Sequence, residues 1–147
     1  MNARTSTLVM GKADIEALIL KVFPQAVGYA AITRLEPGAL ELTKTTDEGH
    51  LRPGGTVSGP VLMTLADTAA YFLILAHLGP VALAVTTNLS IDFLRKGDAG
   101  QLFARASLLK LGRRLALCQV GLYASAANAE VHVAQATVTY SIPPEKD

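Results

Sequence analysis

Apolar residues recur at helical spacing near the start of the chain. In the segment KADIEALILKVF, residues 12–23, four of them stand at i, i+3, i+4 and i+7: Ile15, Leu18, Ile19 and Val22. Positions with this spacing share one face of a helix, and Pro24 cannot continue that helix. The pattern therefore predicts an amphipathic N-terminal helix over about residues 12–23.

Alternating residues follow, and then a polar segment. The stretch AVGYAAITRLEPGALELTKTT predicts two strands around a turn at Glu36-Pro37-Gly38, where proline and glycine occupy favourable turn positions. Residues 47–56 are polar and rich in Gly and Pro, with no periodicity. They predict a loop.

The most apolar stretch of the chain is SGPVLMTLADTAAYFLIL. Ser58 or Gly59 can cap a helix whose first turn contains Pro60, a favoured position for proline. The helix is predicted to run to about His77, because Gly79-Pro80 follows and stops it. Since this helix is apolar nearly all round, we expect it to be covered on most sides.

The remainder of the chain predicts strands: VALAVTTNLSIDFLR, then QLFARASLLKLGRRLALCQVGLYAS, then AEVHVAQATVTYSI. The middle segment is predicted to hold two strands that meet near residues 110–114, and the last segment alternates between two faces. Strands that follow one another without intervening helices favour an antiparallel sheet. The predicted fold class is α+β, with a curved antiparallel β-sheet wrapped around a long central helix.

A single polar stripe runs along the apolar helix. Four residues at i, i+3, i+4 and i+7 form it: Thr64, Asp67, Thr68 and Tyr71. The stripe either faces water, with Asp67 bonded to Thr64 or to nearby backbone, or it lines a half-desolvated cleft. In the second case Asp67 is a candidate general base or nucleophile.

Three glycines in PGGTVSGP lie just before or at the helix start, where backbone can approach a ligand closely. The free N–H groups at a helix start can stabilise an oxyanion, and Gly59 is the best donor because Pro60 has no N–H. Gly59 and Asp67 are eight residues apart, roughly 12 Å along the helix axis. One small reacting group cannot touch both on a single helix. A site that uses both must combine two copies of the helix, which predicts a homodimer.

The length of 147 residues suits one domain, 1–147. Half of the residues are hydrophobic, 17% are charged and the mean hydropathy is +0.35, which predicts apolar surface buried between subunits or lining a ligand tunnel. The net charge of +1 gives no support for nucleic-acid binding. A membrane span is not predicted, because Asp67, His77 and Gly79-Pro80 interrupt the apolar stretch.

Cys118 is the only cysteine, so no internal disulfide can form, and its apolar strand predicts inert packing. A reducing compartment is the simplest setting, and the N-terminus lacks the features of a signal peptide, so we expect a cytoplasmic location. No metal site is predicted, because His50, His77 and His132 have no metal-binding spacing with one another or with Cys118.

The block RPGGTVSGPVLMTLADTAAYF, followed by AVTTNLSIDFLRKGDAG and LLKLGRRLALCQVGLY, resembles the hotdog-fold acyl-CoA thioesterases of the PaaI-like (4HBT) superfamily. The resemblance implies a hotdog fold, homodimers that pair into homotetramers, and thioester hydrolysis at the dimer interface. The substrate is then an acyl-CoA, so coenzyme A is part of the substrate and no cofactor is implied. The helix carboxylate attacks the thioester or activates water, and a glycine N–H of the other subunit holds the oxyanion.

Carried over residue by residue, the resemblance implies that Asp67 is the catalytic carboxylate and Gly59 the oxyanion-hole glycine. Gly55 matches the family's middle glycine. Thr86 matches a position where a small hydroxyl residue lies near the site. The segment IDFLRKG matches the family's strand ending, with Lys96 in place of the usual proline.

Three positions depart from the family pattern: Arg52 replaces Asn, Ser58 replaces His and Pro60 replaces the second Gly. Ser58 can still donate a hydrogen bond, and Arg52 can meet a carboxylate or a phosphate. Either can equally be a cap or loop residue. We expect Ser58 and Thr86 to position water or substrate, and Thr68 to contact the substrate.

Several basic residues near strand ends and turns are candidate ligands for the phosphates of coenzyme A. They are Arg95, Lys96, Lys110, Arg113 and Arg114. Arg95 is the strongest candidate because it follows DFL at the family position. The alternative is that these residues are solvated parts of hairpins.

Two other functions stay open. A hotdog dimer that binds acyl-CoA without hydrolysing it would fit the departures at Arg52 and Ser58. An acyl-thioester dehydratase or hydratase is less well supported, because the fifth residue after Gly59 is Thr64 and not Glu. A thioesterase is favoured, because an idle Asp67 on an apolar helix would be costly.

Overall fold

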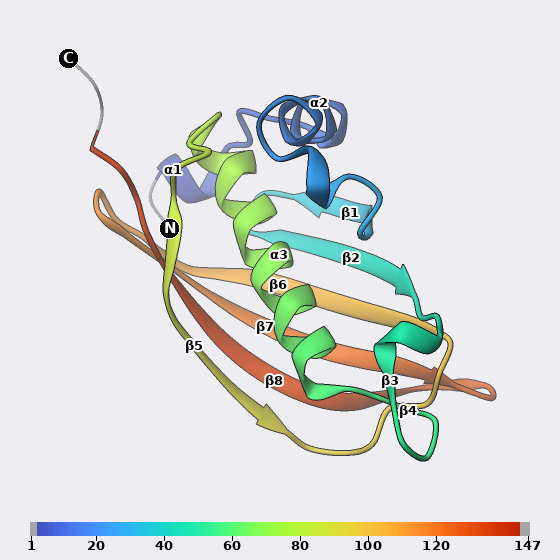
Figure 1. The fold of residues 1–147 in the computed structure, drawn as a ribbon. Helices are drawn as coiled ribbons and strands as arrows, with labels where there is room; N and C mark the ends of the chain where they lie inside the picture. The colour runs from blue at the N-terminus through green and yellow to red at the C-terminus, as the bar shows by residue number, and fades with distance from the viewer. Residues whose placement is uncertain (1–2, 145–147) are drawn as a thin grey trace.

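The protein is described by a computed structural model over residues 3–144. Six strands form one sheet in the order β1-β2-β6-β7-β8-β5, and each neighbouring pair is antiparallel. The long helix α3, Gly59–Leu78, crosses the concave side of this curved sheet (Figure 1). The predicted α+β architecture is confirmed.

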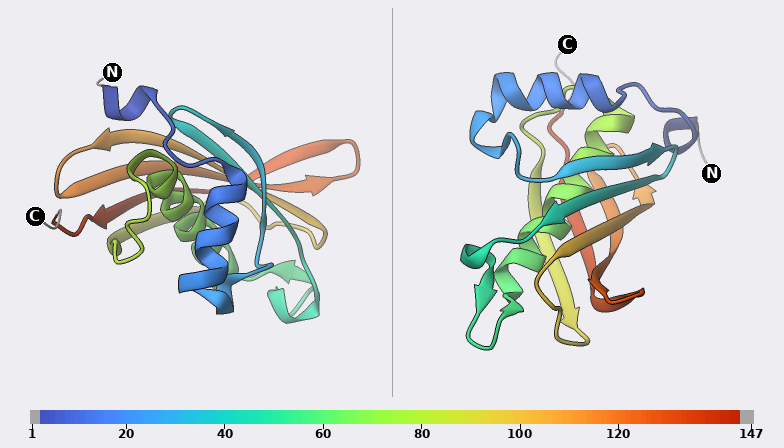
Figure 2. Two further views of the ribbon diagram at one scale, coloured as in Figure 1. Left: turned by 90° about the horizontal axis from the view of Figure 1, so that it is seen from above. Right: turned by 90° about the vertical axis from the view of Figure 1, so that its right-hand side faces the viewer.

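The N-terminal third contains the predicted helix and hairpin. Its elements are α1 Ala3–Ser6, α2 Lys12–Val22, the 3-10 helix η1 Pro24–Ala26, β1 Ala31–Glu36 and β2 Ala39–Thr45. The turn between β1 and β2 contains Gly38 with φ of +81°, which favours glycine. The short helix α1 has no apolar period and was not predicted. Helix α2 lies beside the C-terminal half of α3 at the edge of the sheet (Figure 2).

The segment predicted as a loop is partly regular. It contains the 3-10 helix η2, Glu48–His50, and a small ladder of β3, Leu51–Arg52, with β4, Thr56–Val57. Strands of two residues leave no alternating pattern in the sequence, so the prediction missed them.

Helix α3 begins and ends at the predicted residues. Ser58 is the N-cap and Gly79, with φ of +90°, is the C-cap. Eight of its residues are fully buried: Leu65, Ala66, Ala69, Ala70, Leu73, Ile74, Leu75 and Ala76. Among residues 3–144, α3 is the one helix long and apolar enough to span a membrane, but most of it is buried inside the fold. It is the core helix of the domain.

The C-terminal half forms the larger part of the sheet. Its strands are β5 Val85–Phe93, β6 Gln101–Leu111, β7 Leu115–Ala126 and β8 Ala129–Ser141. The predicted junction between β6 and β7 near residues 110–114 is confirmed. The face of β8 that carries Ala136, Val138 and Tyr140 is buried beneath α3, as its alternation predicts.

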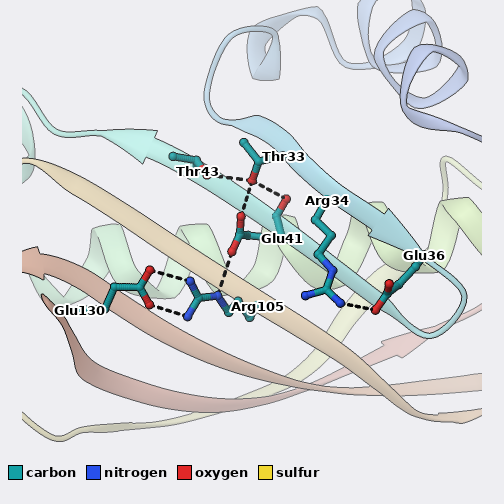
Figure 3. Close-up of polar contacts among 7 residues, drawn as sticks. All are labelled: Thr33, Arg34, Glu36, Glu41, Thr43, Arg105 and Glu130. Atoms are coloured by element: carbon teal, nitrogen blue, oxygen red, sulfur yellow. Dashed lines mark hydrogen bonds and ion pairs between the residues drawn. The ribbon is translucent and has the colours of Figure 1, made fainter.

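The convex face of the sheet carries a charged network centred on Arg105 (Figure 3). The Arg105 guanidinium donates to Glu41 at 2.8 Å and to both carboxylate oxygens of Glu130 at 2.7 and 2.8 Å. Burial opposes ionisation of Glu41, but hydrogen bonds from Thr33 and Arg105 outweigh it and hold its pKa below the usual range. Hydrogen bonds from Arg105 also lower the pKa of Glu130. The network links β2, β6 and β8.

Replacing Arg105 by Met should lower the free energy of unfolding at pH 7 by about 1 kcal/mol, since the pairs are partly exposed and screened by water. Because the folded-state pKa values of Glu41 and Glu130 are depressed, this contribution is complete above the unfolded value of about 4.3 and is lost as the pH falls further. Urea unfolding at pH 7 and pH 3 measures both effects.

The matched control is Arg34→Met. Arg34 pairs only with Glu36 among the described residues, in an exposed contact of 2.7 Å, so its removal should change stability by less than about 0.5 kcal/mol. Equal losses for both variants, or a loss from Arg105→Met that is the same at pH 3 and pH 7, would contradict the stabilising role of the network.

Candidate active site

The polar stripe of α3 lines a cavity. The cavity has a volume of about 570 Å³ and contains all four stripe residues, so the cleft interpretation of the stripe is the correct one. The other lining residues come from the segment between the end of α2 and β1, from α3 and the segment after it, and from β5 and β8: Val22, Phe23, Gln25, Ala26, Tyr29, Phe72, Ala82, Ala84, Val85, Thr86 and Tyr140. Most of them are apolar or aromatic, as in sites that bind small organic ligands.

Asp67 is half-buried on the cavity wall, and its carboxylate is held by two hydroxyl groups. Thr86 donates to Asp67 Oδ1 at 2.7 Å, and Tyr140 donates to the same oxygen at 2.7 Å. The Tyr140 hydroxyl also lies 3.2 Å from the Asp67 carbonyl oxygen. Within residues 3–144, Oδ2 accepts no hydrogen bond, so it is available to a ligand in the cavity.

A register shift in β5 turns Thr86 toward Asp67. Thr86 pairs with Tyr140, but Asn88 pairs with Thr139, so Thr87 is an extra residue in β5. After the shift, Leu89, Ile91 and Phe93 are therefore the positions of β5 that face the helix. Before the shift, Thr86 is the position that does so. Simple alternation would have pointed Thr86 away from α3. Irregularities of this kind re-aim a side chain next to a site.

The other hydroxyls of the stripe bond to backbone. Thr64 donates to Pro60 O at 3.0 Å, and Thr68 donates to Thr64 O at 2.7 Å. Tyr71 donates to Ala82 O at 2.9 Å. These bonds satisfy the hydroxyl protons, so Thr64 and Thr68 present acceptor lone pairs to the cavity. Burial raises the pKa of both Tyr71 and Tyr140 above the ordinary value.

Gly59 and Ser58 lie at the other end of α3, outside this cavity. Ser58 is the N-cap residue, but its side chain makes no capping hydrogen bond; its N–H donates to His50 O at 3.0 Å. Gly59 packs against the end of β5, because a Cβ placed there would lie 3.3 Å from the Phe93 ring. A single chain therefore does not bring Gly59 together with Asp67.

Arg52 and Gly55 lie near this same end of α3. Arg52 is an exposed residue of β3, and Gly55 N–H donates to Arg52 O at 3.0 Å in the turn between β3 and β4. Gly54 and Gly55 have φ of +97° and +79°, so the turn itself requires glycine there. The backbone conformation of this turn is therefore enough to explain why a glycine occupies position 55.

The predicted phosphate ligands do not form one cluster within the chain. Arg95 and Lys96 are exposed just after β5, and Arg95 donates to His132 O at 3.1 Å. Arg113 lies in the β6–β7 turn, at the opposite end of the sheet, because Leu115 and Val85 both pair with Ser141. Arg113 and Arg95 are therefore not neighbours within one chain.

The histidines and the cysteine lie away from the cavity. His77 Nε2 accepts from Gly38 N–H at 3.0 Å, His50 Nδ1 accepts from Asp47 N–H at 2.9 Å, and His132 stacks on Tyr123. Burial raises the pKa of Cys118 to about 12, so its thiol is protonated and unreactive at neutral pH. Within residues 3–144, no three potential ligand residues are grouped to hold a metal ion.

Sequence reasoning missed two parts of the site. Tyr140 belongs to one of the two alternating faces predicted for its strand, but nothing local in the sequence connects it with Asp67. The cavity wall formed by Phe23 and Tyr29 was missed as well, because it depends on how α2 and η1 pack against α3.

Comparisons with known proteins identify the family of this chain. The model of the thioesterase superfamily (4HBT) matches residues 54–128. The structure of a provisionally named thioesterase from Silicibacter sp. TM1040 is 45% identical, with coverage of 95% of this chain and 96% of that chain and a TM-score of 0.82. The structure of a mutant of the phenylacetic acid degradation protein PaaI from Thermus thermophilus is 29% identical, with coverage of 82% and 98% and a TM-score of 0.67.

A provisionally named esterase of Pseudomonas aeruginosa is 33% identical over 100 residues, which are 66% of this chain and 70% of that protein. The fold and these matches define a hotdog-fold thioester hydrolase. The chain belongs to the thioesterase superfamily, whose matched region includes α3 with Gly59 and Asp67.

Proposed function

We propose that the protein is an acyl-CoA thioesterase in which Asp67 is the nucleophile or general base. The most direct support is the position of the Asp67 carboxylate on the wall of a largely apolar cavity. Two hydroxyl groups donate to one of its oxygens and fix its orientation. An apolar cavity suits an acyl group, and a fixed carboxylate suits attack at its carbonyl carbon.

With Asp67 as general base, the carboxylate takes a proton from water and the water oxygen adds to the thioester carbonyl carbon. The carbonyl oxygen becomes an oxyanion, which an N–H donor stabilises. Collapse of the intermediate breaks the C–S bond, and the thiolate of coenzyme A recovers the proton from Asp67. With Asp67 as nucleophile, Oδ2 attacks the carbonyl carbon, and the C–S bond breaks to release the thiolate of coenzyme A. Water then hydrolyses the mixed anhydride, which frees the Asp67 carboxylate and supplies one proton to the acid and one to the thiolate. Both routes give a carboxylic acid and coenzyme A, and neither needs a cofactor.

The oxyanion donor in this proposal is the N–H of Gly59 of the partner subunit. Strand β5 lies at an edge of the sheet and can pair with β5 of a second copy. Thr86 contacts Asp67 near the start of β5, and Phe93 contacts Gly59 at its end. Antiparallel pairing about the middle of β5 therefore places each Asp67 beside the partner's Gly59, with both α3 helices on the same face of the joined sheet.

Exposed apolar side chains at the two ends of β5 support this homodimer. Val85 is 57% exposed and Phe93 52% exposed, and the flanking Leu83 and Leu94 are exposed by 77% and 47%. Exposed apolar residues at the open side of an edge strand are typical of a surface that another chain covers.

The same arrangement gives the basic residues a role. Arg52, Arg95 and Lys96 lie at the Gly59 end of one chain, and Arg113 lies at the Asp67 end. In the proposed dimer these two ends are adjacent, so the phosphates of coenzyme A are held by Arg52, Arg95 and Lys96 of the partner subunit. Ser58 and Gly55 border the same entrance.

The acyl group is proposed to occupy the cavity beside Tyr29, Phe72 and Phe23. A volume of about 570 Å³ is far larger than an acetyl group needs, because one water molecule takes up about 30 Å³. The substrates are therefore medium-chain, long-chain or aryl acyl-CoA thioesters rather than acetyl-CoA.

Asp67→Ala should lower the turnover of acyl-CoA thioesters by about a hundredfold or more, as expected for a general base or nucleophile. Release of free thiol from a panel of acyl-CoAs measures this. Asp92→Ala is the matched control, because Asp92 is an exposed residue of β5 that does not line the cavity. Unchanged activity in Asp67→Ala would exclude the proposed site.

Phe23→Ala should lower kcat/KM for long acyl-CoAs by about fivefold to tenfold, because acyl groups that reach Phe23 lose apolar contact area. Acetyl-CoA or butyryl-CoA turnover should be unchanged. Leu20→Ala is the control, since Leu20 lies on α2 just before Phe23, is 63% exposed and does not line the cavity. The same loss for short and long substrates would contradict the placement of the acyl group.

The second candidate is a non-catalytic acyl-CoA-binding protein. The departures at Arg52 and Ser58 favour it, because these residues replace the Asn and His of the family pattern. Tight binding of acyl-CoA without thiol release from any member of the panel would support this alternative over hydrolysis.

A further inference from the structure

One buried titratable group on the cavity wall contacts the Asp67 carboxylate but takes no part in the bond-making steps above. Tyr140 is only 4% exposed and lies near the end of β8. Its hydroxyl donates to Asp67, at 2.7 Å to Oδ1 and 3.2 Å to the carbonyl oxygen. A buried phenol needs such a partner, and a phenylalanine would fill the same space without one.

Tyr140 and Thr86 act on the same carboxylate oxygen. Both donate to Asp67 Oδ1 at 2.7 Å, from two neighbouring strands. Two donors that converge on one oxygen restrict rotation of the carboxylate and occupy the lone pairs of Oδ1. They leave Oδ2 as the oxygen that faces water or a thioester in the cavity.

We propose that Tyr140 is a positioning residue for the reaction of Asp67: with Thr86 it fixes the carboxylate so that Oδ2 carries out the attack or the proton transfer. This inference rests on the proposed function. Tyr140 touches the carboxylate and not the substrate, so its effect is on how often the carboxylate is correctly aligned. Alignment of a reacting group changes kcat more than KM.

The phenol stays a donor throughout the working pH range. Burial raises the pKa of Tyr140, and the neighbouring charge of Asp67 acts in the same direction, which together outweigh the opposing effect of the Thr86 hydroxyl. Ionisation of the phenol would place two negative charges at hydrogen-bonding distance, which is unfavourable in a buried site.

Tyr71 provides a matched control. Its ring stacks on the Tyr140 ring with a centroid distance of 5.9 Å and an interplanar angle of 21°, and it lines the same cavity. Its hydroxyl, however, donates to Ala82 O and not to Asp67. Tyr71→Phe therefore removes a phenolic hydroxyl from the cavity and keeps both donors to the carboxylate.

The test compares kcat and KM of Tyr140→Phe and Tyr71→Phe for one acyl-CoA that the wild type hydrolyses. Tyr140→Phe should lower kcat by about 10- to 100-fold, the range expected for a hydrogen bond to a charged group, with KM within about twofold. Tyr71→Phe should lower kcat clearly less than Tyr140→Phe does, because both donors to Asp67 remain. Thr86→Val should lower kcat like Tyr140→Phe, and Thr86→Ser should recover most of that loss because it restores a hydroxyl.

The inference is overturned if Tyr140→Phe keeps the wild-type kcat, or if Tyr71→Phe loses as much as Tyr140→Phe, since the loss would then come from packing. Asp67→Ala, measured in parallel, distinguishes failure of the positioning role from failure of the proposed thioesterase function. If Asp67→Ala is inactive while Tyr140→Phe is fully active, only the positioning role of Tyr140 fails. If Asp67→Ala is as active as the wild type, the proposed function fails with it.

Discussion

The hydrogen bonding of the Asp67 carboxylate is the constraint on which the site depends. Asp67 lies on a helix whose neighbouring residues Ala66 and Leu65 are fully buried, and a carboxylate in such surroundings is costly unless donors replace water. Thr86 and Tyr140 supply those donors from β5 and β8. The same contacts therefore stabilise the charge, orient it and attach the middle of α3 to one end of the sheet.

The length of α3 sets the second constraint. The donor end at Gly59 and the carboxylate at Asp67 cannot meet on one rigid helix, and the fold keeps them at opposite ends of β5. In the proposed dimer, antiparallel pairing of β5, an edge strand with exposed apolar residues, brings these unlike ends together. The same proposed pairing gives a reason for the division of the basic residues between the two ends of the sheet. Dimerisation is then part of the proposed chemistry and not only of stability.

Local patterns predicted most of the fold. The helical period of residues 12–23, the Gly79 stop after α3 and the alternation in β8 depend on near neighbours in sequence, and each is confirmed. The polar stripe through Asp67 was also visible in the sequence, because its residues recur at helical spacing. What the sequence could not show depends on contacts between distant segments. The register shift at Thr86 and the Tyr140 contact, 73 residues from Asp67, arise from strand pairing. For the same reason, the sequence placed Arg113 and Arg95 near strand ends but could not show that these are opposite ends of the sheet.

Mixed dimers test the central claim most directly. Asp67→Ala and Gly59→Val chains carrying different tags are expressed together, and the heterodimer is isolated by both tags. In a site built from two chains, the heterodimer has one site with both substitutions and one with neither, so it should show about half of the wild-type thiol release while each parent homodimer is inactive. A heterodimer as inactive as its parents would contradict the shared site, because it would place Gly59 and Asp67 of the same chain in each site.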